Sequence, residues 1–152
     1  MNGTGEQKLI YPGLAGFYAT WSPIAYTLLR VIIGYIIFMH GWGKLGTGVG
    51  GITAYMAKQG LEPGIVFACA AMFLETVGAA CVALGLFTRF FAAALAIEMG
   101  IAFVHVHLPK GFAANKGGFE FVLLIGIVLF AIAIRGGGPT RSIERSARNC
   151  KL

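Results

Sequence analysis

The chain has 152 residues, of which 57% are hydrophobic and 12% are charged, and none is an aspartate. A soluble domain carries roughly 25% charged residues, so the composition excludes an ordinary water-soluble surface and indicates an integral membrane protein. The net charge of +6 gathers near the C-terminus. Because no RNA- or DNA-binding motif accompanies it, we expect that charge to meet anionic lipid headgroups rather than nucleic acid.

Residues 1–21 are expected to form an interfacial segment that leads into the membrane. Glycines and a proline interrupt any apolar run here, and no clear signal-peptide cleavage site follows. Aromatic rings suit the headgroup level of a bilayer. The segment places Tyr11, Phe17, Tyr18 and Trp21 there, and Pro23 then stands in a position typical of a helix start.

Residues 22–135 contain four apolar segments, each near the ~20 residues that a membrane-spanning helix needs. Backbone groups inside a bilayer must find partners within their own segment, so the pattern predicts an all-α bundle of four transmembrane helices. The expected spans are residues 24–41, 64–86, 90–108 and 119–134.

The connections between these segments differ in length and composition. Residues 46–63 form a glycine-rich loop in which we expect a short helix around residues 52–58. Residues 85–89 read as a tight turn, and residues 110–118 as a medium loop. A glycine run then opens a basic tail, residues 136–152. Its positively charged residues are Arg141, Arg145, Arg148 and Lys151, and Arg135 directly precedes it.

The distribution of lysine and arginine predicts the orientation. Four spans place both termini and the turn 85–89 on one side, which holds seven of these residues against four on the other. The positive side of a membrane protein faces the cytoplasm, so both termini are expected there.

Ionisable residues within the spans are the candidates for function, because an Arg, Lys or Asp at a helix centre costs about 2.5–3.5 kcal/mol on insertion scales. Near the midplane we expect Arg30, Glu75 and Glu98, and at the non-cytoplasmic end His40, His105 and Glu120. In one hypothesis Arg30 pairs with Glu75 or Glu98 and only fixes helix packing. In the other, the same groups line a pocket for a quinone, a proton or a small polar ligand.

Helical spacing adds detail to this pocket. Glu98 and His105 are seven residues apart and share a helix face, whereas His107 points elsewhere and is expected at the interface. His40 and Lys44 also share a face if the helix continues through Gly41 and Gly43. Those glycines could instead break the helix and expose backbone groups to a ligand.

Metal and disulfide chemistry are not expected. No His-x-x-x-His or Glu-x-x-His pair presents two metal ligands on one helix face. A haem would need histidines on facing helices, which only His40 and His105 could supply. Cys69 and Cys81 are twelve residues apart on one expected helix, a rise of about 18 Å that prevents a disulfide. The third cysteine is Cys150.

Several short motifs follow one another along the chain in an order that is typical of a known family. They are Leu29-Arg30 with Gly34, His40-Gly41-Trp42-Gly43-Lys44-Leu45, Leu74-Glu75 with Gly78, Leu84-Gly85-Leu86-Phe87-Thr88-Arg89, Gly117-Gly118-Phe119-Glu120 and Arg141-Ser142-Ile143-Glu144. Over residues 23–144 this order resembles the DoxX family of small four-helix membrane proteins. The resemblance implies a four-helix subunit located in a bacterial-type inner membrane. Some members of the family are associated with quinone-linked oxidation, including thiosulfate:quinone oxidoreductase.

The functional expectation is therefore a membrane subunit of a quinone-linked oxidoreductase system, with a partner protein supplying electrons. Protons would move through Glu75, Glu98 and His105, and the ligand would contact Arg30, His40, Lys44 and Glu120. One alternative is a non-catalytic structural or assembly subunit of a larger membrane complex. Another is a small-solute or proton transporter, which would require several copies of the chain.

Overall fold

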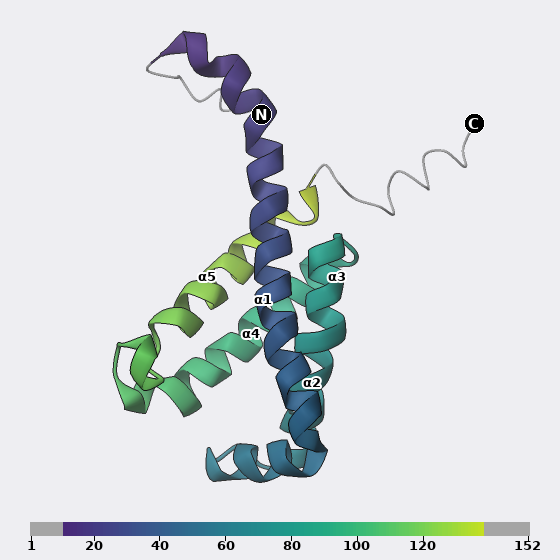
Figure 1. Ribbon diagram of the computed structural model, residues 1–152, viewed down its shortest axis with the longest axis vertical. Helices are drawn as coiled ribbons and strands as arrows, with labels where there is room; N and C mark the ends of the chain where they lie inside the picture. Colours follow the sequence, from purple (N-terminus) through teal and green to yellow (C-terminus); the bar gives the residue numbers. More distant parts are fainter. Residues whose placement is uncertain (1–10, 139–152) are drawn as a thin grey trace, which may run out of the picture.

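The computed structural model describes residues 11–138, and this part of the chain contains helices and turns but no strand. The helices are α1 (Ala15–Lys58), α2 (Gly64–Phe73), α3 (Ala79–Leu84), α4 (Thr88–Ala102) and α5 (Glu120–Arg135) (Figure 1). A π-helical turn, Leu74–Gly78, joins α2 to α3, so these two helices form one continuous rod. The predicted all-α bundle of four rods is confirmed. Most of the basic tail and Cys150 lie outside the described residues.

Three helical segments are long and apolar enough to cross a membrane: Pro12–Lys58, Gly64–Leu84 and Thr88–Lys110. They contain nearly all of the first three expected spans. The fourth, α5, has 16 residues, a few fewer than the ~20 that usually cross a bilayer. Large apolar side chains such as Leu28, Ile97 and Phe130 are exposed, as the lipid-facing surface of a membrane protein requires.

Helix α1 begins earlier than the sequence suggested. It starts at Ala15, so Pro23 lies inside the helix rather than at its start. Proline removes one backbone hydrogen bond from a helix, and the carbonyl of Pro23 accepts a hydrogen bond from the Thr27 hydroxyl at 2.9 Å. The first turns of α1 project beyond the other helices (Figure 1) and expose Phe17, Tyr18 and Trp21.

Gly48, and not Gly41 or Gly43, interrupts α1. Its φ of 79° and ψ of 157° are not helical, and the positive φ favours glycine. The helix then turns sideways across the end of the bundle (Figure 1). Ile52 and Met56 pack there into a cluster that includes Ala68 and other residues of α2. The expected helix around residues 52–58 is therefore confirmed as the last part of α1.

Two glycines allow α1 to lie directly against the α2–α3 rod. A Cβ atom on Gly34 would sit 2.8 Å from the Ala79 carbonyl oxygen, and one on Gly41 would sit 2.7 Å from the Glu75 carbonyl oxygen. The two glycines are seven residues apart and so share one helix face. This close contact sets the position of Glu75 relative to α1.

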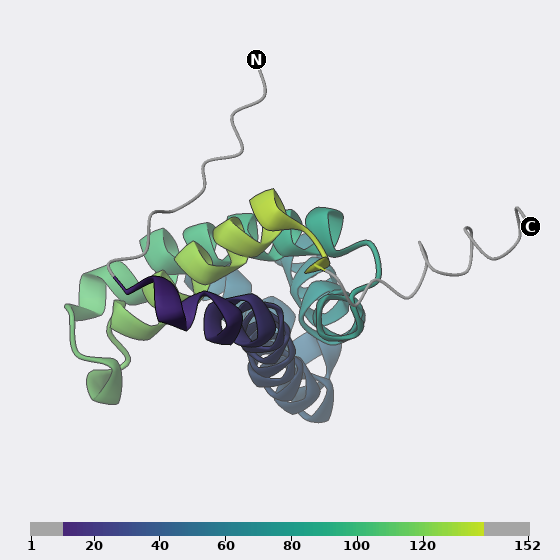
Figure 2. The ribbon, with the colours of Figure 1, turned by 90° about the horizontal axis from the view of Figure 1, so that it is seen from above.

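Helices α4 and α5 form the other half of the bundle. Gly85 and Phe87 both have a positive φ in the tight turn between α3 and α4, as expected for residues 85–89. The loop before α5 is closed by a hydrogen bond of 3.0 Å from the Phe119 N–H to the Gly111 carbonyl. Seen from above, α1 and the α2–α3 rod are nearly end-on while α4 and α5 run obliquely beside them (Figure 2).

Candidate functional site

A cavity of about 500 Å³ lies among α1, the α2–α3 rod, α4 and α5. We call it the central cavity. Its volume falls within the ~300–1,000 Å³ typical of small-molecule sites. Most of its wall is apolar, and the polar or ionisable side chains on the wall are His40, Lys44, Tyr55, Glu75, Glu98 and His107.

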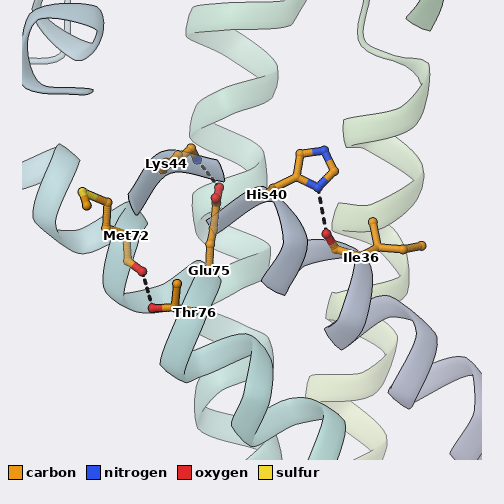
Figure 3. Close-up of polar contacts among 6 residues, drawn as sticks. All are labelled: Ile36, His40, Lys44, Met72, Glu75 and Thr76. Carbon is orange, nitrogen blue, oxygen red and sulfur yellow. Dashed lines mark hydrogen bonds and ion pairs between the residues drawn. The ribbon is translucent and has the colours of Figure 1, made fainter. Parts of the chain in front are cut away.

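An ion pair between Lys44 and Glu75 joins α1 to the π-helical turn Leu74–Gly78 on the wall of the central cavity (Figure 3). The Lys44 ammonium donates a hydrogen bond to Oε1 of Glu75. Glu75 is buried, with 4% of its surface exposed. Gly41, one turn before Lys44 on α1, lets the backbone of Glu75 lie close to α1. Such π-helical turns occur frequently at functional sites. Beside it, the Thr76 hydroxyl donates to the Met72 carbonyl.

Glu98 of α4 brings a second carboxyl to this pair. Its carboxyl lies within electrostatic reach of both Glu75 and Lys44. Oε2 of Glu75 and Oε2 of Glu98 are both buried and make no other hydrogen bond within residues 11–138, and the two carboxyls lie close enough to interact through a shared proton. Buried oxygens normally have partners, so this carboxyl pair beside a cavity indicates a place where a proton or a water binds. The arrangement sets two carboxyls against one ammonium group.

His40 is an exposed residue on the wall of the central cavity. Its Nδ1 lies 2.8 Å from the Ile36 carbonyl oxygen (Figure 3). A carbonyl can only accept, so Nδ1 carries the proton and Nε2 of the neutral ring is an acceptor. The ring lies 6.4 Å from that of Phe121 on α5. The expectation that His40 and Lys44 share a face holds, because α1 continues through the intervening glycines.

The structure exchanges the expected roles of His105 and His107. His105 is exposed and absent from the cavity wall, whereas His107 lines the cavity and its Nδ1 donates to the Gly117 carbonyl at 2.7 Å. The cause is a second π-helical turn, Phe103–His107. This turn adds a residue to the helix, so the seven-residue spacing from Glu98 no longer leads to the same face. Val106 is buried in its place.

Arg30 does not line the central cavity, which contradicts the expectation that it pairs with Glu75 or Glu98 and holds the pocket. It is buried at the other end of the bundle, where its guanidinium donates to the Val82 carbonyl at 2.7 Å. Fourteen residues of helix separate it from Lys44, which corresponds to about 21 Å along the axis. The helices are therefore offset so that Lys44, and not Arg30, reaches the depth of Glu75.

Glu120 is also absent from the wall of the central cavity. It is the first residue of α5 and is half-buried, and the next residue, Phe121, lines the cavity. A carboxylate in the first turn of a helix is stabilised by the helix dipole. Its position is therefore explained by the start of α5 alone.

Sequence reasoning missed Tyr55 and misjudged His107. Tyr55 reaches the cavity only because α1 turns at Gly48. A glycine-rich stretch followed by a helical pattern signals a turn, but not its direction. Within the described residues, no group of three or more His, Cys, Asp or Glu side chains could hold a metal ion.

The fold and the cavity together define a small helical membrane protein with a polar site enclosed by apolar walls. The DoxX family model matches residues 25–108, more than half of the chain and the part that carries Arg30, Lys44, Glu75 and Glu98. The chain belongs to the DoxX family.

Two curated relatives extend this finding. The chain is 32% identical over 105 residues to a Bacillus subtilis protein named "Putative oxidoreductase CatD", a match that covers 69% of this chain and 75% of the relative. It is 29% identical over 125 residues to an uncharacterized protein of Haemophilus influenzae, covering 78% of this chain and 87% of the relative. No solved structure matches the chain.

Proposed function

We propose that this protein is a membrane subunit of a quinone-linked oxidoreductase system and that its central cavity binds the quinone headgroup. One observation carries the proposal: a Lys44–Glu75 pair and the neighbouring Glu98 carboxyl line a cavity whose wall is mostly apolar. A quinone has the matching form, a flat apolar ring with two oxygens at opposite edges. The name of the Bacillus subtilis relative supports a redox role.

The residues of the cavity fit both redox states of such a ligand. A quinone carbonyl accepts a hydrogen bond, which the Lys44 ammonium can donate. A quinol hydroxyl donates one, which Nε2 of His40 can accept. Apolar side chains such as Phe67 and Phe121 line the same cavity and would contact the ring.

The two carboxyls would manage the protons. Reduction of a quinone takes up two electrons and two protons, and oxidation of the quinol releases them. The electrons would come from, or go to, a partner redox protein. With one ammonium beside two carboxyls, a proton held by Glu98 removes an uncompensated buried charge. Glu98 would thus hold a proton beside the ligand, while Lys44 holds the Glu75 side chain in place.

We further propose that the helices cross a bacterial inner membrane several times with both termini in the cytoplasm. The excess of lysine and arginine on the side of the termini supports this orientation. The central cavity would then open toward the opposite compartment. Labelling of single cysteines placed at Gly13 and at Lys58 with a membrane-impermeant reagent would test it, and labelling of Gly13→Cys from outside the cell would contradict it.

Binding of decylubiquinone to the protein in nanodiscs, followed by calorimetry, tests the proposed ligand. We expect saturable binding that Lys44→Gln weakens about tenfold or more, because a hydrogen bond to a charged group contributes about 1.5–3 kcal/mol. Glu98→Gln keeps a neutral donor and should weaken binding less. Glu62→Gln is the matched control, since this exposed carboxylate lies outside the cavity wall. Absence of binding, or equal affinities in all variants, would reject the proposal.

The projecting start of α1 favours a second candidate, a structural subunit of a larger membrane complex. Phe17, Tyr18 and Trp21 are exposed beyond the bundle (Figure 1), where another protein could contact them. Co-purification of a large complex that is lost in a Phe17→Ser/Trp21→Ser variant, together with no quinone binding, would select this candidate.

A further inference from the structure

A second cavity, of about 580 Å³, lies along α4 and α5 and shares only the wall residues Ile97, Met99 and Val122 with the central cavity. We call it the α4–α5 groove. Small residues open it: Ala93, Ala96 and Gly100 on α4, and Gly126 and Ala133 on α5. No atom lies within 4 Å of a Cβ built on Gly100. The groove is thus a place where a slender apolar chain can lie against the helices.

One residue of the groove wall is charged, and it stands at one end. Arg89, in the first turn of α4, is exposed and has no hydrogen-bond or ion-pair partner among residues 11–138. Arg30 and Arg135 lie at the same end, since the guanidinium groups of all three act electrostatically on the Tyr26 hydroxyl. Arg135 also stacks on the Tyr26 ring at 4.4 Å.

No described carboxylate balances these cations locally. The carboxylates within residues 11–138 are Glu62, Glu75, Glu98 and Glu120. Glu75 and Glu98 line the central cavity, whereas Glu62 precedes α2 and Glu120 begins α5, both at the opposite end. The described part of the molecule is therefore positively charged at the end of the groove where Arg89 lies, and an anion would be attracted there.

The length of the groove fits one leaflet of a bilayer. The wall runs from Arg89 to Phe103 along α4, which is about 21 Å of helix. Half of a hydrocarbon core is about 15 Å thick, so an oblique helix of this length reaches from the headgroup level to the midplane. An apolar helix of another protein would fill the groove but leave Arg89 unpaired, at a cost that a phosphate avoids.

We propose that the α4–α5 groove is a specific site for a phospholipid with an anionic headgroup. The phosphate accepts hydrogen bonds from the Arg89 guanidinium, a charge-assisted contact. One acyl chain lies along the groove between Gly100 and Gly126. This site is separate from the central cavity and does not depend on the proposed quinone chemistry.

Native mass spectrometry of the whole protein, released from micelles that contain equal amounts of phosphatidylglycerol and phosphatidylcholine, tests the site. We expect one phosphatidylglycerol to remain bound to the wild type. Arg89→Gln should reduce its retention about fivefold, the contribution of one cation near a membrane surface. Arg89→Lys should retain most of it. Gly100→Leu fills the groove and should reduce the retention of both lipids.

Two matched controls accompany these variants. Lys58→Gln removes an exposed cation at the opposite end of the bundle, and Gly16→Leu adds the same side chain where no atom lies within 4 Å. Both should retain the lipid as the wild type does. Equal retention of the two lipids by the wild type, unchanged retention in Arg89→Gln, or a change of oligomeric state in Gly100→Leu without loss of lipid would each overturn the proposal.

Discussion

Two cations on helix α1, Arg30 and Lys44, are held in opposite ways. Arg30 is 2% exposed and donates to a backbone carbonyl at the end of α3. A Cβ on Gly85 would lie 2.6 Å from the guanidinium, so Arg30 packs directly against the turn after α3. The Lys44 side chain is 26% exposed, is paired with a carboxylate and faces the central cavity.

The difference separates a structural charge from a functional one. A buried guanidinium that donates to a backbone carbonyl of α3 fixes the packing of α1 on α3. An ammonium that faces a cavity can share its hydrogen bonds between its carboxylate partner and a ligand. The hydrogen-bond partner of a buried cation and the space around it thus indicate its role better than the free-energy cost of placing the charge in the membrane does.

The first prediction separates the two cations by their effect on stability. Arg30→Met should lower the free energy of unfolding by about 3 kcal/mol, because it leaves a buried carbonyl unsatisfied and a void beside Gly85. The protein that stays folded should bind decylubiquinone as the wild type does. Thermal unfolding in detergent measures the first effect and calorimetry the second. A loss of ligand binding without a loss of stability would reverse the roles assigned here.

The second prediction tests the contact that positions Glu75. Gly41→Ala should destabilise the protein by about 2 kcal/mol, because the new Cβ would sit 2.7 Å from backbone atoms of Glu75. Gly43→Ala is the control on the same helix, where nothing lies within 4 Å. It should be neutral or stabilise the helix by about 0.5–1 kcal/mol. Equal effects in thermal unfolding would mean that the close contact is not required.

The third prediction concerns the Lys44–Glu75 pair itself. Lys44→Gln and Glu75→Gln should each destabilise the protein, and the double variant should lose less than the sum, with a coupling energy of about 1–2 kcal/mol. A double-mutant cycle of unfolding free energies measures this coupling. Strict additivity would show that the two side chains do not depend on each other.

The smallest expected effect distinguishes the two neighbouring histidines. His107→Ala removes the hydrogen bond to the Gly117 carbonyl and should cost about 1 kcal/mol. His105→Ala removes an exposed ring and should stay within about 0.5 kcal/mol of the wild type. Thermal unfolding of both variants decides between them. The opposite order would restore the face that α-helical spacing alone assigns to His105.

The sequence was sufficient to predict the helical architecture. The length of the apolar segments alone located the α2–α3 rod and α4, because a segment that spans a bilayer has few alternatives to a helix. The free-energy cost of an ionisable side chain within a span singled out Glu75 and Glu98 as candidates, and both line the central cavity. The prediction of the helices succeeds because it depends on how each segment meets the bilayer rather than on neighbouring helices.

The details of the site depend on contacts between helices, which the sequence did not reveal. The partner of Glu75 is set by how far α1 is shifted along the α2–α3 rod, and small residues at Gly34 and Gly41 determine that shift. Helix direction predicts which ends meet but not this offset. The exchange of His105 and His107 arose from one π-helical turn, which no residue pattern in this segment signalled.

The two π-helical turns, Leu74–Gly78 and Phe103–His107, have a consequence for how such a site can change. Each accommodates one residue more than a regular helix would, and each carries a side chain of the cavity. Deleting a single codon within the second turn, at Phe103 or Val104, would return the segment to α-helical geometry while Val106 and His107 keep their places, because the turn alone absorbs the extra residue. The chain can therefore change in length by one residue at such a turn without changing which side chains face the cavity.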